Sequence, residues 1–122
     1  MPEPLPAPTA PRPPLAVVFT TVGAGTDAES LARTLILEGL AACVNILPAM
    51  ISVYCWQGTL ERDAEQQLVI KTSIDRVDAL EARLRALHPY EIPEFVVVSA
   101  TASDAYAAWV RRAVTPVTAS DS

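Results

Sequence analysis

The chain has 122 residues, a length that fits one domain better than two. Nine basic against fourteen acidic residues give a net charge of −5, which disfavours nucleic acid, because its binding depends largely on neutralising phosphates. No apolar run approaches the roughly 20 residues that span a bilayer, and the start lacks the pattern of a signal peptide. We therefore expect a soluble, cytoplasmic protein that binds neither nucleic acid nor a membrane.

Both ends of the chain differ in composition from its middle. Residues 1–14 hold seven of the eleven prolines, and such a stretch buries too little surface to offset its ordering entropy. Residues 117–122 are small and polar. We therefore predict a disordered proline-rich arm over 1–14, a folded domain over 15–116 and a disordered tail over 117–122.

The first half of the predicted domain has the pattern of a strand, a helix and a second strand. Residues 15–22 are almost all apolar and often β-branched, which indicates a buried strand. Thr26 and Glu29 have the spacing of a capping box. Apolar side chains then recur at helical spacing, at Ala28, Leu31, Ala32, Leu35, Ile36 and Gly39. Residues 43–47 start the second strand, and Pro48 marks a bend or an edge position.

The second half begins with a long hairpin. Polarity alternates over 51–56, and the region around 57–63 forms the hairpin end, with a return strand over 67–72. A helix follows from about Asp75 to His88, where Pro89 ends it, and Glu81 and Arg85 form a favourable pair on its solvent side. A buried strand over 95–100 and a helix capped by Ser103 complete the domain.

This order of elements, β-α-β-β-α-β with an extra C-terminal helix, predicts an α+β fold of the ferredoxin-like sandwich type. Its helices would cover one face of the sheet and leave the other uncovered. Because a large exposed apolar face usually marks a partner, we expect an oligomer. Cys43 and Cys55 would lie roughly 40 Å apart on one extended segment, too far for a disulfide, so we expect free thiols.

Residues 88–94 form the segment that local structure explains least. They include the only histidine of the chain, two carboxylates, a tyrosine and two prolines. Imidazole and carboxylate groups bind divalent ions, and copper and zinc prefer imidazole. In the alternative interpretation, His88 hydrogen-bonds the end of its own helix, where a cation is favoured. From these residues alone both interpretations stay open, and His88, with Glu91 and Glu94 nearby in sequence, is the candidate metal ligand.

Other motifs have simpler explanations. Residues 23–28 match the dinucleotide fingerprint, but the next strand enters a hairpin, so a glycine turn and a capped helix are the better interpretation. Cys43 or Cys55 with His88 lacks a third orienting residue, so we predict no catalytic residue and no enzymatic activity. Lys71 is either a solvated edge lysine or the partner of an anionic group such as Glu94.

Several segments together resemble the CutA family of divalent-cation tolerance proteins. They are residues 41–46, 52–58, 71–72, 88–94 and 104–109, within a similarity that spans about Val17 to Val114. The resemblance implies a tight homotrimer of ferredoxin-like subunits with long hairpins that wrap their neighbours. It also implies a link to copper and other divalent ions, no established reaction, and a likeness to PII signalling proteins, whose ligands lie in clefts between subunits.

The chain differs from some copper-associated members of this family at two positions. Thr20 stands where those members have a cysteine, and Leu87 stands where they have a second histidine, so that only His88 carries over. The first hypothesis is a non-catalytic homotrimer that binds divalent ions such as copper(II) through His88 and Glu91 and requires no cofactor. The alternative is a PII-like module that holds a small anionic metabolite in an inter-subunit cleft lined by Tyr54, Trp56, Lys71 and Glu94.

Overall fold

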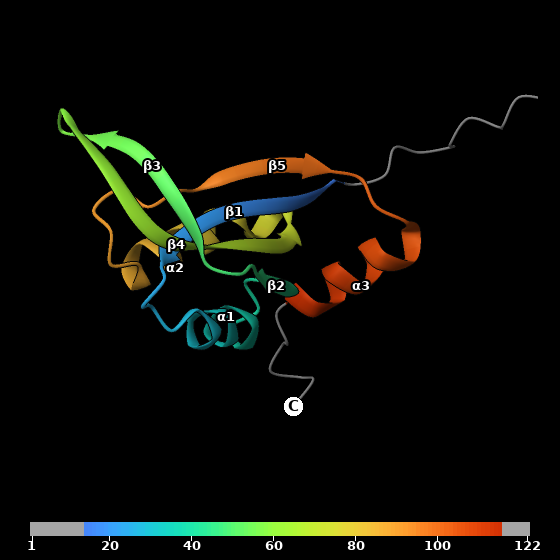
Figure 1. Cartoon of the computed structure of the whole chain (residues 1–122). Coiled ribbons are helices and arrows are strands. Elements are labelled where there is room, and N and C mark those ends of the chain that lie inside the picture. Colours follow the sequence, from blue (N-terminus) through green and yellow to red (C-terminus); the bar gives the residue numbers. More distant parts are fainter. Residues whose placement is uncertain (1–13, 116–122) are drawn as a thin grey trace, which may run out of the picture.

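The computed structural model describes residues 14–115; residues 1–13 and 116–122 lie outside it, and with them most of the predicted arm and all of the predicted tail. Figure 1 shows the elements, which are β1 (Leu15–Gly23), α1 (Ala28–Leu37), β2 (Cys43–Ile46), β3 (Met50–Trp56), β4 (Thr59–Ser73), the 3-10 helix η1 (Ile74–Arg76), α2 (Val77–Leu87), β5 (Val96–Ala100) and α3 (Asp104–Val114). The predicted order of elements is confirmed. Within the described range, no helix has the length and apolarity that a membrane crossing requires.

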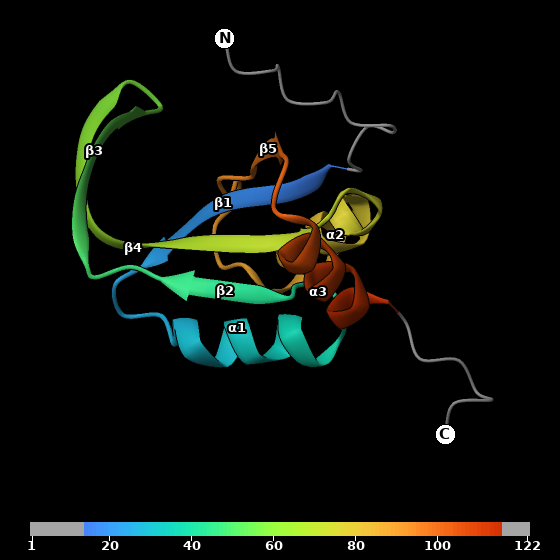
Figure 2. The ribbon, with the colours of Figure 1, turned by 90° about the vertical axis from the view of Figure 1, so that its right-hand side faces the viewer.

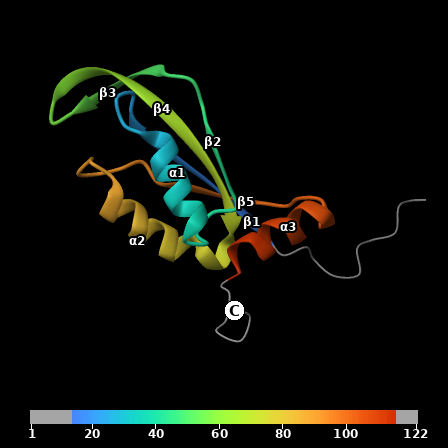
Figure 3. The ribbon, with the colours of Figure 1, turned by 90° about the horizontal axis from the view of Figure 1, so that it is seen from below.

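The strands form one antiparallel five-stranded sheet. Its order is β2-β4-β1-β5, and β3 pairs with the first half of β4 beyond the end of β2. Helices α1 and α2 lie next to each other on one face of the sheet (Figure 3), whereas α3 lies at the end where β1 begins. This is the ferredoxin-like α+β arrangement that the alternating pattern predicts.

The core lies between the sheet and the two helices. Every second residue of β1 faces the helices, and the members of this row are fully buried: Ala16, Val18, Thr20 and Val22. They pack with Leu68 and Ile70 of β4, Leu35 of α1, and Leu80 and Leu84 of α2. A second, smaller cluster holds α3 against the sheet end through Leu15, Ala42, Ala107, Val110 and Val114.

The start of α1 differs from the prediction by one residue. Asp27, not Thr26, is the N-cap, and its carboxylate accepts a hydrogen bond from the backbone N–H of Ser30 at 3.0 Å. The backbone N–H of Thr26 instead bonds the carbonyl oxygen of Gly23 at 2.9 Å, so Thr26 belongs to the preceding turn. The predicted cap of α3 is confirmed, because the Ser103 hydroxyl accepts from the N–H of Tyr106 at 3.2 Å.

The return strand of the hairpin is longer than predicted. Gln57 (φ 50°) and Gly58 (φ 80°) close a two-residue turn directly after Trp56, so that β4 begins at Thr59 rather than at 67. A turn with positive φ at both central residues matches the twist of the flanking strands, which lets pairing continue up to the turn. The hairpin therefore extends well beyond the four-stranded core and curls away from it (Figure 2).

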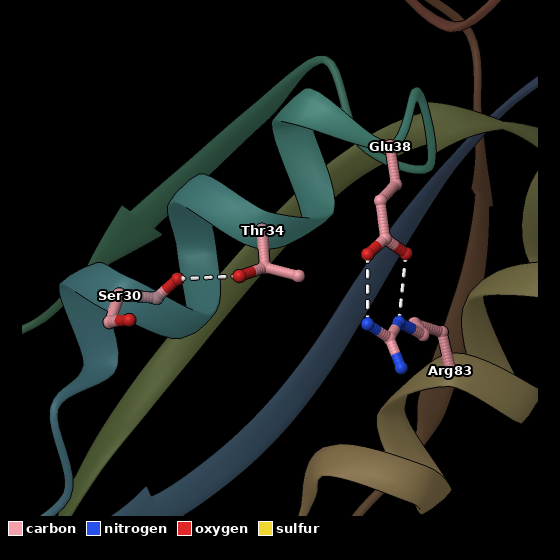
Figure 4. A network of polar contacts seen from close by, with 4 residues as sticks. All are labelled: Ser30, Thr34, Glu38 and Arg83. Atoms are coloured by element: carbon pink, nitrogen blue, oxygen red, sulfur yellow. Dashed lines mark hydrogen bonds and ion pairs between the residues drawn. The ribbon is translucent and has the colours of Figure 1, made fainter.

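An ion pair joins the C-terminal end of α1 to α2 (Figure 4). The Arg83 guanidinium donates from Nε to Glu38 Oε1 at 2.8 Å and from Nη2 to Oε2 at 2.9 Å. The hydrogen bond from Arg83 also lowers the pKa of the Glu38 carboxyl. The predicted pair on α2 is present as well, with Arg85 Nη2 at 2.8 Å from Glu81 Oε2. The first pair links α2 to the end of α1, and the second lies within α2 itself.

The sheet face opposite α1 and α2 is open in the described chain, as predicted. The register places five apolar residues together at its centre, namely Val17, Phe19, Val69, Val96 and Val98. The expectation of a buried last strand is wrong for the single chain, because Val96 is 48% and Val98 45% exposed. The reason is that β5 is an edge strand whose apolar side chains face this open surface. Cys43 and Cys55 are free thiols on β2 and β3, as expected.

Candidate functional site

His88 connects the loop over residues 88–94 to strand β1. Its side chain is buried, with 7% of the residue exposed. Its Nε2 lies 2.6 Å from the carbonyl oxygen of Thr21, and its Nδ1 accepts a hydrogen bond from the backbone N–H of Tyr90 at 3.1 Å. Because a backbone N–H can only donate, Nδ1 carries a lone pair and Nε2 carries the proton. Both ring nitrogens of the neutral imidazole therefore have partners.

The local sequence explains why the imidazole reaches β1. Pro89 disfavours a helical backbone in the residue before it, and His88 is extended (φ −82°, ψ 134°) directly after the last turn of α2. The N–H of His88 still bonds the carbonyl oxygen of Leu84 at 2.8 Å, so the helix end is satisfied. The chain then turns along the open side of the sheet, where the Tyr90 ring lies 4.8 Å from the imidazole.

The hairpin β3-β4 and the loop over 88–94 line an open cavity of about 700 Å³ next to β1. Its wall contains three aromatic side chains, Tyr54, Trp56 and Tyr90, and three carboxylates, Glu65, Glu91 and Glu94; it is completed by Thr21, Met50, Ser52, Val53, Gln67, Pro89, Ile92 and Pro93. None of these lining residues is a lysine or an arginine. This cavity is the acidic pocket.

Glu65 is the most buried carboxylate of the acidic pocket, with 6% of the residue exposed. Its Oε2 accepts a hydrogen bond from the Tyr90 hydroxyl at 2.7 Å. Burial, and then this bond, raise the pKa of Tyr90 to about 12, so the phenol stays a proton donor at neutral pH. None of the ion pairs among residues 14–115 involves Glu65. A buried carboxylate without a counter-charge is costly, so this side chain favours a cation nearby.

Two further hydrogen bonds shape the pocket. The Tyr54 hydroxyl donates to Asp63, which raises the pKa of Tyr54 to about 12. Gln67 Nε2 donates to Glu94 Oε2 at 3.1 Å and ties the loop to β4. The hydroxyls of Tyr54 and Tyr90 and the amide of Gln67 therefore all donate to carboxylates. The pocket wall contains both carboxylate oxygens and aromatic rings.

Four of the predicted site residues meet in the acidic pocket: Tyr54, Trp56, Glu91 and Glu94. His88 lies directly behind the pocket, in contact with Tyr90. Lys71 is not part of the lining; the register places it between Cys43 and Val17 on the open face.

Sequence reasoning missed Glu65 and Gln67 as site residues. The signal was the row of polar residues at 61, 63, 65 and 67, which alternate along β4 and share one face of the strand. The predicted return strand begins only at residue 67 and the predicted hairpin end covers 57–63, so this continuous row is divided between two segments in the prediction. The pairing of Met50 with Glu65 puts the row beside Tyr54 and Trp56.

The chemistry of the pocket fits cations, but not a tight metal centre within one chain. Among the described residues, no group of three or more His, Cys, Asp or Glu side chains is arranged to hold a metal ion. Divalent ions in proteins usually take about four to eight ligands. His88 can ligate a metal only after losing its bond to Thr21 or to Tyr90. A metal site at His88 and Glu91 stays a prediction, and the pocket carboxylates offer oxygen ligands that water or another subunit would have to complete.

A family model and several known proteins are similar to nearly the whole described chain. The model for the CutA1 divalent ion tolerance protein matches residues 16–113. A curated relative from Thermus thermophilus, called divalent-cation tolerance protein CutA, is 42% identical over 96 residues, which are 78% of this chain and 93% of the relative.

Two solved structures show the same fold. CutA from Xylella fastidiosa has a TM-score of 0.79 at 39% identity, over 83% of this chain and 98% of that one. A protein described as PII-like CutA from Nostoc sp. PCC 7120, in apo form, has a TM-score of 0.76 at 32% identity, over 82% of this chain and 97% of that one.

Proposed function

Because this chain belongs to the CutA1 divalent ion tolerance family, we propose that it is a non-catalytic homotrimer that binds divalent metal ions such as copper(II). The observation that supports binding is the acidic pocket, in which Glu65, Glu91 and Glu94 are not balanced by any lining lysine or arginine. A concave site lined by one sign of charge raises the local concentration of counter-ions. Carboxylate oxygens provide the first contacts, and bound water or a neighbouring subunit supplies the remaining ligands.

The open sheet face supports the proposed assembly. Its five valine and phenylalanine side chains form an apolar surface that a monomer would leave in water. A second and a third copy of the chain bury this surface, and the long hairpin has the reach to contact a neighbour (Figure 2). The acidic pocket opens beside the same face, so the proposed trimer brings it to the boundary between subunits. The free thiols fit the cytoplasmic location that we propose, since that compartment keeps cysteines reduced.

The second candidate is a PII-like module for a small anionic metabolite. The likeness to the Nostoc protein that is described as PII-like CutA favours it. The charge of the pocket favours the first candidate, because three carboxylates repel an anion and Lys71 lies outside the lining. An anionic ligand would need a positive charge from another subunit.

A calorimetric titration with copper(II) tests the proposed function. The wild-type protein is compared with a Glu91→Gln, Glu94→Gln double variant and with Glu29→Gln, a matched control on the exposed surface of α1. Light scattering in the same buffer gives the mass. We expect saturable binding to a trimer, weakened about tenfold or more in the double variant and unchanged in the control. Equal binding by all three proteins would exclude Glu91 and Glu94 as metal ligands.

A further inference from the structure

Glu65 lacks a positive charge beside it. The residue is more than nine-tenths buried and lines the acidic pocket. Its Oε2 accepts from the Tyr90 hydroxyl, whereas its Oε1 has no hydrogen-bond partner among the residues that the structure describes. No lysine or arginine among residues 14–115 forms an ion pair with Glu65, so a cation in the pocket would supply the missing positive charge.

The walls of the pocket distinguish between kinds of cation. Tyr54, Trp56 and Tyr90 present aromatic rings to the same cavity. Aromatic faces, and that of indole above all, attract organic cations, whereas a strongly hydrated divalent ion prefers several oxygen ligands that point to one position. No such convergence of three acidic, histidine or cysteine ligands exists in the described chain. The cavity, at about 700 Å³, also has room for a small organic molecule.

We propose that the acidic pocket binds a small organic ammonium ion, whose nitrogen donates to Oε1 of Glu65 and whose carbon atoms pack on Trp56 and Tyr54. The inference rests on the proposed cation preference of the pocket, and it names a ligand class other than a bare metal ion. The negative charges of Glu91 and Glu94, on the loop side of the pocket, also attract the ammonium ion. The hydrogen bond from Gln67 to Glu94 ties the loop to β4 beside the pocket.

Trp56 provides a direct readout. The chain has two tryptophans, and Trp109→Phe leaves Trp56 as the only indole, inside the pocket wall. The full-length variant is titrated with n-butylammonium chloride at constant ionic strength while tryptophan fluorescence is followed. The neutral 1-butanol and the anionic butyrate are matched probes with a similar carbon chain.

We expect a saturable change with butylammonium, and binding about tenfold or more weaker for the alcohol and for butyrate. Glu65→Gln in the same background removes the charge with little change in shape and should weaken butylammonium binding by a similar factor. Glu29→Gln should leave it unchanged. Glu65→Asp, which keeps the charge, should retain part of the affinity, provided that circular dichroism shows each variant to be folded.

Several results would overturn the proposal. Butylammonium that binds no better than 1-butanol would show that the pocket does not recognise the charge. If butylammonium does not bind and Glu65→Gln lowers the oligomer mass, the missing charge comes from a neighbouring subunit instead. A copper(II) titration of the same variant separates the two proposals: copper binding alone leaves the proposed function standing, and butylammonium binding alone supports only the ammonium site.

Discussion

Replacing His88 by alanine tests whether this residue holds the site loop in place. The change removes the contact of Nε2 with the Thr21 carbonyl oxygen at 2.6 Å and the bond from the Tyr90 N–H to Nδ1 at 3.1 Å. A hydrogen bond contributes about 0.5–1.5 kcal/mol net, and a buried polar group left unpaired costs about 1–3 kcal/mol. Because the residue is buried, we expect His88→Ala to lose about 2–4 kcal/mol of folding free energy.

Urea unfolding followed by circular dichroism measures this loss. With a slope of about 1–3 kcal/mol per M, the midpoint should fall by about 1 M or more. All proteins are compared at one protomer concentration, since unfolding of an oligomer depends on concentration. The matched control is Leu87→Ala at the exposed neighbouring position, which should shift the midpoint far less. His88→Gln, whose amide can still donate to Thr21, should lie between the two.

The result that would refute the reasoning is a midpoint for His88→Ala within the error of the wild type. In that case the two hydrogen bonds would make no net contribution to the folding free energy, and His88 would not be what holds the loop in place.

Three further predictions concern capping and pH. Asp27→Ala removes the N-cap of α1 and should cost about 0.5–2 kcal/mol, and Asp27→Asn much less, in the same urea assay. The hydrogen bond from Arg83 lowers the pKa of Glu38, so the ionised Glu38 stabilises the folded protein above the ordinary pKa of 4.5. This stabilisation is lost as the pH falls through the pKa in the folded protein, and Glu38→Gln should therefore reduce the loss of stability in acid. The pKa of Tyr90 is raised from 10.0 to about 12, so the protonated phenol stabilises the folded protein below pH 10, and this stabilisation is lost between pH 10 and 12. If the folding free energy of Tyr90→Phe falls as steeply with pH over this range as that of the wild type, the prediction is contradicted.

The periodic parts of the fold could be predicted because one face of each element is buried by the same chain. Val18 and Val22 on β1, and Leu35, Leu80 and Leu84 on the helices, produced patterns that fixed the element types. The start of α1 could not be fixed, since Thr26 and Asp27 are both good caps and a backbone bond of the preceding turn decides between them.

The parts that could not be predicted depend on contacts that leave no repeat in the sequence, or on surfaces that this chain does not cover. The first half of β4 has no apolar alternation, because it lies in the hairpin beyond the core. Val96 and Val98 have the composition of a buried strand, yet they face an open surface that a partner would cover. Sequence marked His88 as a ligand, but it could not reveal that Thr21 and Tyr90 already engage both ring nitrogens. The burial of Glu65 also has no signature in sequence, because its pocket joins two segments about 25 residues apart.

A crystal structure of the oligomer with copper(II), located by anomalous scattering, tests the central claim most directly. We predict three subunits packed through their open sheet faces. We also predict an anomalous peak in each acidic pocket, about 2.0–2.6 Å from oxygen atoms of Glu91, Glu94 or Glu65. Peaks only outside the pocket, or an assembly that leaves Val17, Val96 and Val98 in solvent, would contradict this prediction.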